Sequence, residues 1–118
     1  VRHILPNLMH IVIIALVMNA LEAMEGNKEN ARTLTIVTAL PSPKAELVEV
    51  AVIDDGRGIS DSAALHQLFK PFYSTKANGI GMGLPISKTL VESYGGKIWA
   101  EQNARKGLCI KFTLPFES

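Results

Sequence analysis

The chain has 118 residues, of which 12 are Lys or Arg and 11 are Asp or Glu, giving a formal net charge of +1. So small a net charge excludes a broad field of one sign for gripping nucleic acid or an anionic lipid surface, so a phosphate-bearing ligand would have to be recognised locally. Hydrophobic residues make up 47% and charged residues 19%, which excludes a disordered chain and predicts a single globular domain over residues 1–118.

Two further features bear on where the protein works. Cys109 is the only cysteine, so an internal disulfide is excluded and we expect a reducing, cytoplasmic compartment. The longest apolar run, 11–18, is far shorter than the roughly 18–20 residues that cross a membrane. Because Val1 opens the chain in place of Met, we expect a fragment of a longer protein, and the sequence leaves open whether that parent is anchored to a membrane.

The first half of the chain predicts a strand, a long helix and two more strands. Residues 1–4 are expected to form a short edge strand. A helix is expected from 7 to about 25, because apolar side chains recur at every third and fourth position, and Asn19 falls on or beside that stripe. The apolar members of the stripe are Leu8, Ile11, Val12, Ala15, Leu16, Ala20 and Ala23. Residues 33–39 alternate as a strand does. Residues 46–53 are apolar on most of both faces, which is typical of a strand in the middle of a sheet.

The second half predicts two helices and a closing pair of strands. A short helix is expected over 60–68 and a long one over 84–94, which a pair of glycines ends. Residues 97–101 and 108–115 are expected to pair as the last two strands. The whole pattern predicts an α+β fold, a two-layer α/β sandwich in which a mixed sheet of about five strands carries about three helices on one face.

Asn19 is the first candidate for chemistry. Its amide is expected on the buried side of the long helix, where polar atoms without partners cost on the order of 1–3 kcal/mol. The carboxamide oxygen suits Mg²⁺, a cation that prefers oxygen ligands. The structural alternative is a buried Asn whose polar atoms are satisfied by backbone groups.

The second candidate is the segment that directly follows the central strand. Asp54 can accept a hydrogen bond from an exocyclic amine such as that of adenine. Gly56 and Gly58 permit tight turns and the close approach of a flat ligand. The alternative is a plain turn, because Asp-Gly is a common turn dipeptide.

The third candidate is a run of alternate glycines, Gly79, Gly81 and Gly83, that opens the second long helix. Exposed backbone N–H groups and the positive end of the helix dipole together suit a polyphosphate. The spacing matches neither a Walker loop nor a dinucleotide-binding fingerprint, and a flexible glycine hinge is the alternative. Just upstream, the aromatic segment 69–76 would pack on the core and carry Lys76 over the phosphates, or be a packed loop with a solvated lysine.

Taken in order, these segments resemble the four boxes of the catalytic domain of sensor histidine kinases, within the GHKL superfamily and its Bergerat ATP-binding fold. Residues 19–24 resemble the asparagine box, 54–59 the first glycine box, 69–76 the phenylalanine box and 79–84 the second glycine box. The tail of the chain is similar to the closing helix and strands of the family, so the resemblance covers nearly the whole chain.

The resemblance implies a role for each matching residue. Asn19 would bind the Mg²⁺ that bridges the phosphates of ATP, and Lys76 would contact the phosphates as the second catalytic residue. Asp54 would accept the adenine amine, and Thr113 would support the adenine end of the site. The other residues implied in nucleotide binding are Glu22, Ala23, Gly56, Gly58, Ile59, Phe69, Ser74, Thr75, Gly79, Gly81, Met82, Gly83 and Leu84.

The resemblance also implies a reaction and partners. ATP would be held with Mg²⁺ so that its γ-phosphate meets a histidine on a separate, dimeric helical hairpin, and a response regulator would act downstream. That hairpin is expected upstream of this chain, because His3, His10 and His66 lack the His-Glu context of the acceptor. We therefore expect this fragment to be monomeric or at most weakly associated, and its parent to be a homodimer.

Two features place this chain within the family, a likeness to one branch and a departure from the common pattern. Only Ala77 and Asn78 separate Lys76 from Gly79, so the lid over the nucleotide is very short, as in the oxygen- and nitrogen-sensing branch. Many members carry a second polar residue one helical turn before the metal-binding Asn, where this chain has Ala15. Ala15 keeps open the alternative of a nucleotide-binding regulatory module with weak or no kinase activity. Another GHKL ATPase is the second alternative, and the short lid argues against it because such ATPases usually have longer lids.

Overall fold

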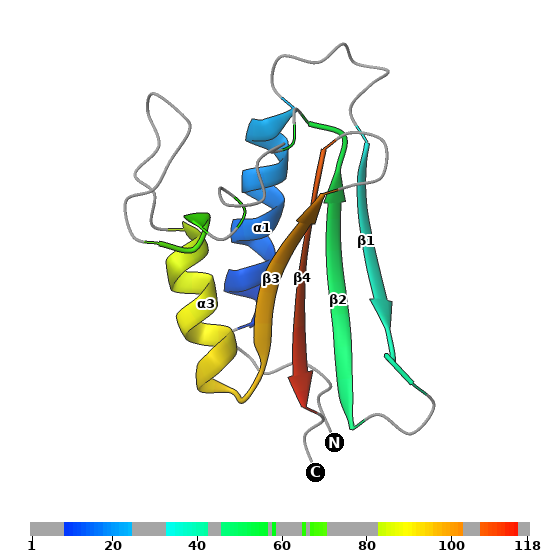
Figure 1. Ribbon diagram of the computed structural model, residues 1–118, viewed down its shortest axis with the longest axis vertical. Coiled ribbons are helices and arrows are strands. Elements are labelled where there is room, and N and C mark those ends of the chain that lie inside the picture. Colours follow the sequence, from blue (N-terminus) through cyan, green and yellow to red (C-terminus); the bar gives the residue numbers. More distant parts are fainter. Residues whose placement is uncertain are drawn as a thin grey trace.

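The computed structural model of the protein describes residues 9–24, 33–42, 46–56, 58, 65, 67–70, 83–102 and 107–115. Their regular elements, seen in Figure 1, are α1 (Met9–Ala23), β1 (Leu34–Ala39), β2 (Leu47–Asp54), α3 (Gly83–Ser93), β3 (Lys97–Gln102) and β4 (Leu108–Pro115). The helices and strands predicted over these segments are confirmed, with small shifts at their ends.

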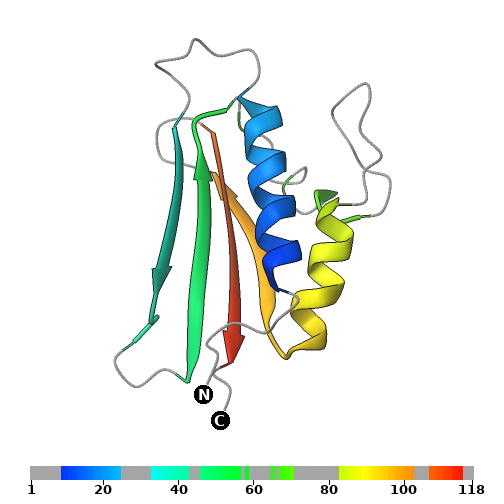
Figure 2. The same ribbon diagram turned by 180° about the vertical axis from the view of Figure 1, so that it is seen from behind.

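The described strands form one sheet in the order β1-β2-β4-β3, and both helices cover the same face of it (Figures 1 and 2). The predicted two-layer α+β fold is confirmed. The sheet differs from the expected mixed one in that the four described strands pair only antiparallel. Strands that follow each other along the chain, such as β1 and β2, join antiparallel through a short connection. The strand expected at 1–4 and most of the helix expected at 60–68 lie outside the described residues.

The core lies between the helices and the two central strands. Alternate residues of a strand point to opposite faces, and the register sets Val50 opposite Phe112 and Val52 opposite Ile110. These four side chains are at most 3% exposed, which places them on the face that the helices cover. The core side chains that α1 adds at helical spacing are Met9, Val12, Leu16 and Ala20.

The apolar stripe of α1 faces the core largely as predicted, because Val12, Leu16 and Ala20 are all at most 2% exposed. Ile11, which the same spacing puts on the stripe, is the exception at 42% exposed. Asn19 lies beside the buried stripe and is partly buried, as expected. None of the helices in the described part of the chain has the length and apolar character needed to cross a membrane.

A Schellman motif ends α3, which confirms the predicted role of its two glycines. The N–H of Gly96 donates to the carbonyl of Val91 at 3.0 Å, and the N–H of Gly95 donates to the carbonyl of Glu92 at 3.0 Å. Gly95 has a φ of 83°, the left-handed conformation that this cap requires. The motif lies at the opposite end of the molecule from the end of β2 (Figure 1).

Candidate functional site

Asp54 is the last residue of the central strand β2, and it is only 4% exposed. Its Oδ1 accepts two backbone hydrogen bonds, from the N–H of Gly56 at 2.8 Å and from the N–H of Leu108 at 3.2 Å. The first bond closes the turn that leaves β2. The second comes from the neighbouring strand, because β4 begins where the antiparallel β2 ends. Two separate parts of the sequence therefore orient this carboxylate.

The environment of Asp54 favours its neutral form more than water does. Burial raises the pKa of this carboxyl, the bonds from Gly56 and Leu108 lower it, and the nearby charge of Asp55 raises it, with a net upward direction. When ionised, the group can only accept hydrogen bonds. A buried acceptor at the end of a central strand is suited to a ligand that presents an amine.

Two glycines bring their backbones together beside Asp54. Gly58 and Gly107 have φ angles of 67° and 96°. A Cβ on Gly107 would lie 2.0 Å from the carbonyl oxygen of Asp54, and a Cβ on Gly58 would lie 2.8 Å from the carbonyl oxygen of Gly107. Side-chain Cβ atoms essentially never come closer than 3.0 Å to such atoms, so only glycine fits at either place.

The contact with Gly107 gives Gly58 a packing role in addition to the expected one of leaving room for a flat ligand. No local pattern marks Gly107 or Leu108 as a site residue, because a glycine between two expected strands is typical of a hairpin turn. The pairing of β2 with β4 is what brings both residues to Asp54. The sequence signal for this contact is a glycine, Gly107, directly before the first residue of β4.

Asn19 lies in the C-terminal half of α1, which packs on β2 and on α3. Helix α1 and strand β2 run in the same direction, so the Asn19 end of the helix and the Asp54 end of the strand reach the same end of the molecule (Figures 1 and 2). Helix α3 runs the other way, and its first turn, where Leu84 is buried, faces that end. The elements that carry an amide, a carboxylate and a helix N-terminus thus converge.

The structure describes the other residues predicted at this end to different extents. Phe69 is partly buried and packs against the core, as predicted. For Glu22, Ala23 and Gly83 only their places in α1 and α3 are described. Ile59, Ser74, Thr75, Lys76, Gly79, Gly81 and Met82 lie outside the described residues, as does the short lid.

Thr113 is not brought to this end. It stands opposite Glu49 in β2, five positions before Asp54, and opposite Lys97 in β3. Its Oγ1 accepts a hydrogen bond from the backbone N–H of Lys97 at 3.2 Å. At roughly 3.4 Å per residue, five positions along a strand correspond to about 17 Å. Leu108 is the β4 residue that lies beside Asp54.

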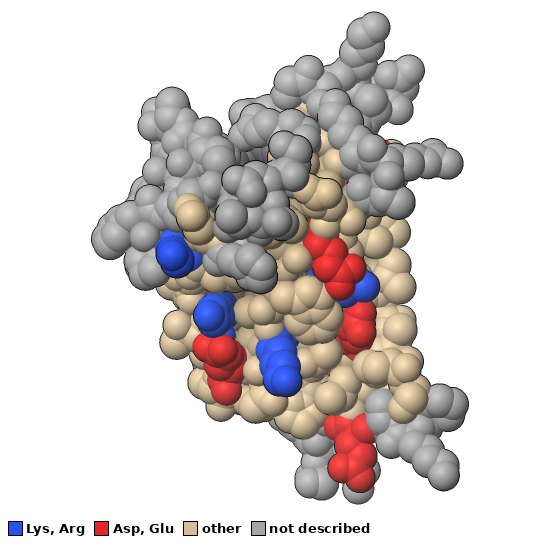
Figure 3. Space-filling model, in the orientation of Figure 1, with Lys and Arg blue, Asp and Glu red and all other residues tan. Residues whose placement is uncertain are grey.

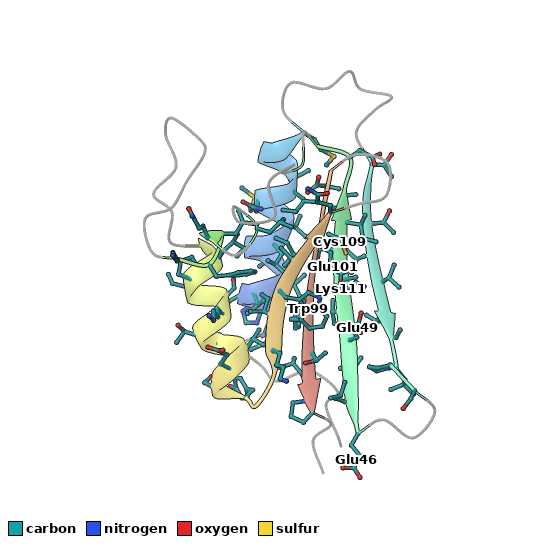
Figure 4. All side chains as sticks on the ribbon, in the orientation of Figure 1. Glu46, Glu49, Trp99, Glu101, Cys109 and Lys111 are labelled. Carbon is teal, nitrogen blue, oxygen red and sulfur yellow. The ribbon has the colours of Figure 1, made fainter. Side chains whose placement is uncertain are left out.

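The sheet face away from the helices carries a separate polar network (Figure 4). The indole N–H of Trp99 donates to Glu101 Oε2 at 2.7 Å, and Lys111 Nζ lies 3.2 Å from Glu101 and 3.6 Å from Glu49. Figure 3 shows acidic and basic side chains close together on this face. The network joins β2, β4 and β3. Burial raises the pKa of the nearby Cys109 thiol, which keeps it in its unreactive form.

Comparison with known proteins places the chain in a family. Residues 5–118 match the family described as histidine kinase-, DNA gyrase B- and HSP90-like ATPases, and the chain belongs to it. The chain is 41% identical over 104 residues to the sensor protein FixL of Bradyrhizobium diazoefficiens, a match that covers 88% of this chain and 20% of FixL. It is 38% identical over 104 residues to the sensor histidine kinase TmoS of Ectopseudomonas mendocina, covering 88% of this chain and 10% of TmoS. The chain thus spans a fifth or less of these relatives.

Solved structures agree with this placement. The nucleotide-free catalytic domain of histidine kinase ThkA superposes with a TM-score of 0.71 at 35% identity, over 88% of this chain and 63% of that one. The mycobacterial sensor histidine kinase MprB superposes with a TM-score of 0.76 over 91% of this chain and 71% of that one, and at 22% identity this likeness shows the fold alone. The predicted kinship with sensor histidine kinase catalytic domains is confirmed, and it supports ATP binding in two-component signalling.

Proposed function

We propose that this domain binds ATP together with Mg²⁺ and donates the γ-phosphate to a histidine on a separate, dimeric helical hairpin of the same protein. The observation that carries the proposal is the buried Asp54 carboxylate at the end of β2, held by two backbone N–H donors. Asp54 accepts the exocyclic amine of adenine, and Gly56, Gly58 and Ile59 surround the ring. A ligand without an amine at that position leaves the buried carboxylate without this donor.

The phosphate end of the nucleotide is assigned to the segments around α1 and α3. Asn19 holds Mg²⁺ through its carboxamide oxygen, a ligand type that this ion prefers. The positive end of α3 favours negative charge near Gly83 and Leu84. The residues assigned to the same region are Glu22, Ala23, Phe69, Ser74, Thr75, Lys76, Gly79, Gly81 and Met82, with Lys76 contacting the phosphates in the transfer step. Thr113 is left out of the assignment, because it lies far along β4 from Asp54.

Phosphoryl transfer in such a site depends on positioning and on charge neutralisation more than on covalent chemistry by the protein. ATP supplies the phosphoryl group, and this domain orients it. The acceptor hairpin and a downstream response regulator are the proposed partners, with the domain itself monomeric and working in the cytoplasm. The matched segment makes up only 20% of FixL and 10% of TmoS, and the additional length of these relatives supports such further segments.

Binding of Mg²⁺ and ATP to the isolated domain tests the first half of the proposal. Titration calorimetry should show ATP binding that weakens on removal of Mg²⁺. Asn19→Ala should abolish the dependence on Mg²⁺ while leaving adenosine binding in place, because adenosine lacks phosphates for the metal to bridge. An Asn19→Ala variant that keeps the full dependence on Mg²⁺ would show that the metal is held elsewhere.

Phosphoryl transfer is tested in the full-length protein with labelled ATP. Label should appear on a histidine of the hairpin, and Asp54→Ala should prevent it. The second candidate function, a nucleotide-binding regulatory module with little kinase activity, is favoured by Ala15. This apolar side chain stands one helical turn before Asn19, on a partly buried position of α1. Nucleotide binding without labelling of any histidine would support that candidate and contradict the transfer reaction.

A further inference from the structure

Gly107 and the backbone N–H of Leu108 contact Asp54, although neither residue belongs to one of the four sequence boxes. The N–H of Leu108 is the second donor to Asp54 Oδ1, across a separation of 54 residues in sequence. Gly107 precedes it directly and lies against Asp54, where a Cβ would be 2.0 Å from the carbonyl oxygen of Asp54 and 2.9 Å from its Oδ1. The missing side chain of Gly107 is therefore what lets β4 approach closely enough for this hydrogen bond.

We propose that Gly107 and the Leu108 N–H are positioning residues for adenine recognition, which fix the orientation of the Asp54 carboxylate. The ligand named here rests on the proposed function, whereas the positioning of Asp54 rests on the contacts alone. The side chain of Leu108 takes no part, since it is 5% exposed and belongs to the hydrophobic core.

The two donors to Asp54 differ in what they fix. The N–H of Gly56 lies two residues on, so this bond shapes the local turn and moves with it. The N–H of Leu108 belongs to the first residue of a central strand, so its bond ties the carboxylate to the sheet. Both N–H groups donate to the same oxygen, Oδ1, and together they fix the orientation of the carboxylate.

Gly58 extends this chain of contacts back into the first glycine box. A Cβ on Gly58 would lie 2.8 Å from the carbonyl oxygen of Gly107 and 3.1 Å from its nitrogen. Gly58 therefore packs on Gly107, and Gly107 packs on Asp54. Gly107, from the β3–β4 connection, thus contacts both Asp54 and Gly58, which belong to the same glycine box.

Three glycine-to-alanine variants form a matched series, because Gly95, Gly58 and Gly107 have φ angles of 83°, 67° and 96°. Each alanine brings comparable backbone strain. The variants differ in what the new Cβ meets: the Pro115 Cγ at 3.6 Å for Gly95, the Gly107 carbonyl oxygen at 2.8 Å for Gly58, and the Asp54 carbonyl oxygen at 2.0 Å for Gly107. Gly95→Ala is thus the control for strain without a clash at Asp54.

The first measurement compares ATP with inosine triphosphate, which has a carbonyl oxygen where adenine has its amine. Gly95→Ala should keep the affinity and the preference of the parent protein. Gly107→Ala should lose about tenfold or more in ATP affinity, as expected for one misplaced hydrogen bond to a charged group. Its affinity for inosine triphosphate should stay near that of the parent, because the phosphate contacts lie elsewhere. Undiminished preference for ATP in Gly107→Ala would overturn the inference.

The second measurement needs no nucleotide. Amide signals of Gly56 and Leu108 should both follow the protonation of Asp54 in an acid titration by NMR, and Asp54→Asn should remove this shared response. In Gly107→Ala the Leu108 amide should stop following it while the Gly56 amide continues, and an unchanged Leu108 response would overturn the inference. If Gly107→Ala does not fold, Gly58→Ala serves, since a displaced Gly107 must also weaken the Leu108 response.

The two measurements separate the inference from the proposed function. A parent protein that binds neither nucleotide, but whose Leu108 amide behaves as described, would refute the function and support the positioning of Asp54. A parent that prefers ATP, with Gly107→Ala showing the same preference, would refute the positioning and leave the function standing.

Discussion

At the scale of single residues, the site is built around a carboxylate that is costly to bury. Desolvation raises the pKa of Asp54, and two backbone N–H groups only partly offset this effect. A residue serving stability alone would do better as a neutral acceptor of the same shape. The proposed recognition of adenine would account for a charge at this position, and its removal should separate stability from binding.

Asp54→Asn should keep both backbone hydrogen bonds, because the amide oxygen can accept them, and should remove the buried charge. We expect a melting temperature at neutral pH equal to or above that of the parent. Because the pKa of Asp54 is raised on folding, the destabilising effect of its charge is absent below the unfolded pKa and sets in as the pH rises through the folded pKa. The advantage of Asp54→Asn should grow over that window in thermal denaturation, and a variant less stable than the parent at neutral pH would contradict this.

Asp54→Ala is the contrasting change. It leaves the N–H groups of Gly56 and Leu108 without their acceptor in a buried place, which costs on the order of 1–3 kcal/mol. Urea denaturation should show a loss of this size at neutral pH. A loss close to zero would mean that these two donors find other partners.

Ala15 offers a gain-of-function test on α1. It is partly buried one turn before Asn19, so a second amide there would point toward the same surroundings. Ala15→Asn should raise Mg²⁺-dependent ATP affinity by a factor of about ten, the value of one added polar contact. Ile14→Asn is the matched control, because Ile14 is 58% exposed and lies about 100° further round the helix. Equal gains in both variants, measured by calorimetry, would argue against a metal site beside Asn19.

At the scale of elements, the sheet has two faces with different tasks. The face toward the helices is apolar and closes the core, whereas the opposite face carries the network of Trp99, Glu101, Lys111 and Glu49 across three strands. The indole N–H of Trp99 and then Lys111 lower the pKa of Glu101. Because the Glu101 side chain is 46% exposed, this network contributes little free energy of folding.

Trp99→Phe removes the indole donor and leaves an aromatic ring in place. The lowered pKa of Glu101 contributes stability that is present above its unfolded pKa and is lost as the pH falls through its folded pKa. The variant should therefore be slightly less stable at neutral pH, by about 0.5 kcal/mol or less, and the difference should disappear in acid. Urea denaturation at several pH values checks this. A difference that persists unchanged in acid would indicate lost packing instead of a lost hydrogen bond.

At the scale of the whole molecule, the sequence predicts elements better than contacts between them. Strand β2 is predictable because it is apolar on most of both faces, and the end of α3 because two glycines follow it. The antiparallel pairing of β2 with β4 depends on residues far apart in the sequence, and no local pattern encodes it. The contact of Gly107 with Asp54 is not predictable for that reason, and the expected burial of Ile11 is wrong because an apolar side chain is no proof of burial.

Helices α1 and α3 and strand β2 converge at one end of the molecule (Figure 1). The most direct test of a nucleotide site there is whether Asp54 makes the protein prefer ATP over inosine triphosphate. Calorimetry on the parent and on Asp54→Asn, each with ATP and with inosine triphosphate in the presence of Mg²⁺, gives a complete cycle. The parent should prefer ATP by about tenfold or more, and Asp54→Asn should lose or reverse that preference, because its amide N–H can donate to the inosine carbonyl. Equal preference for ATP in both proteins would contradict the assignment of Asp54 as the acceptor of the adenine amine.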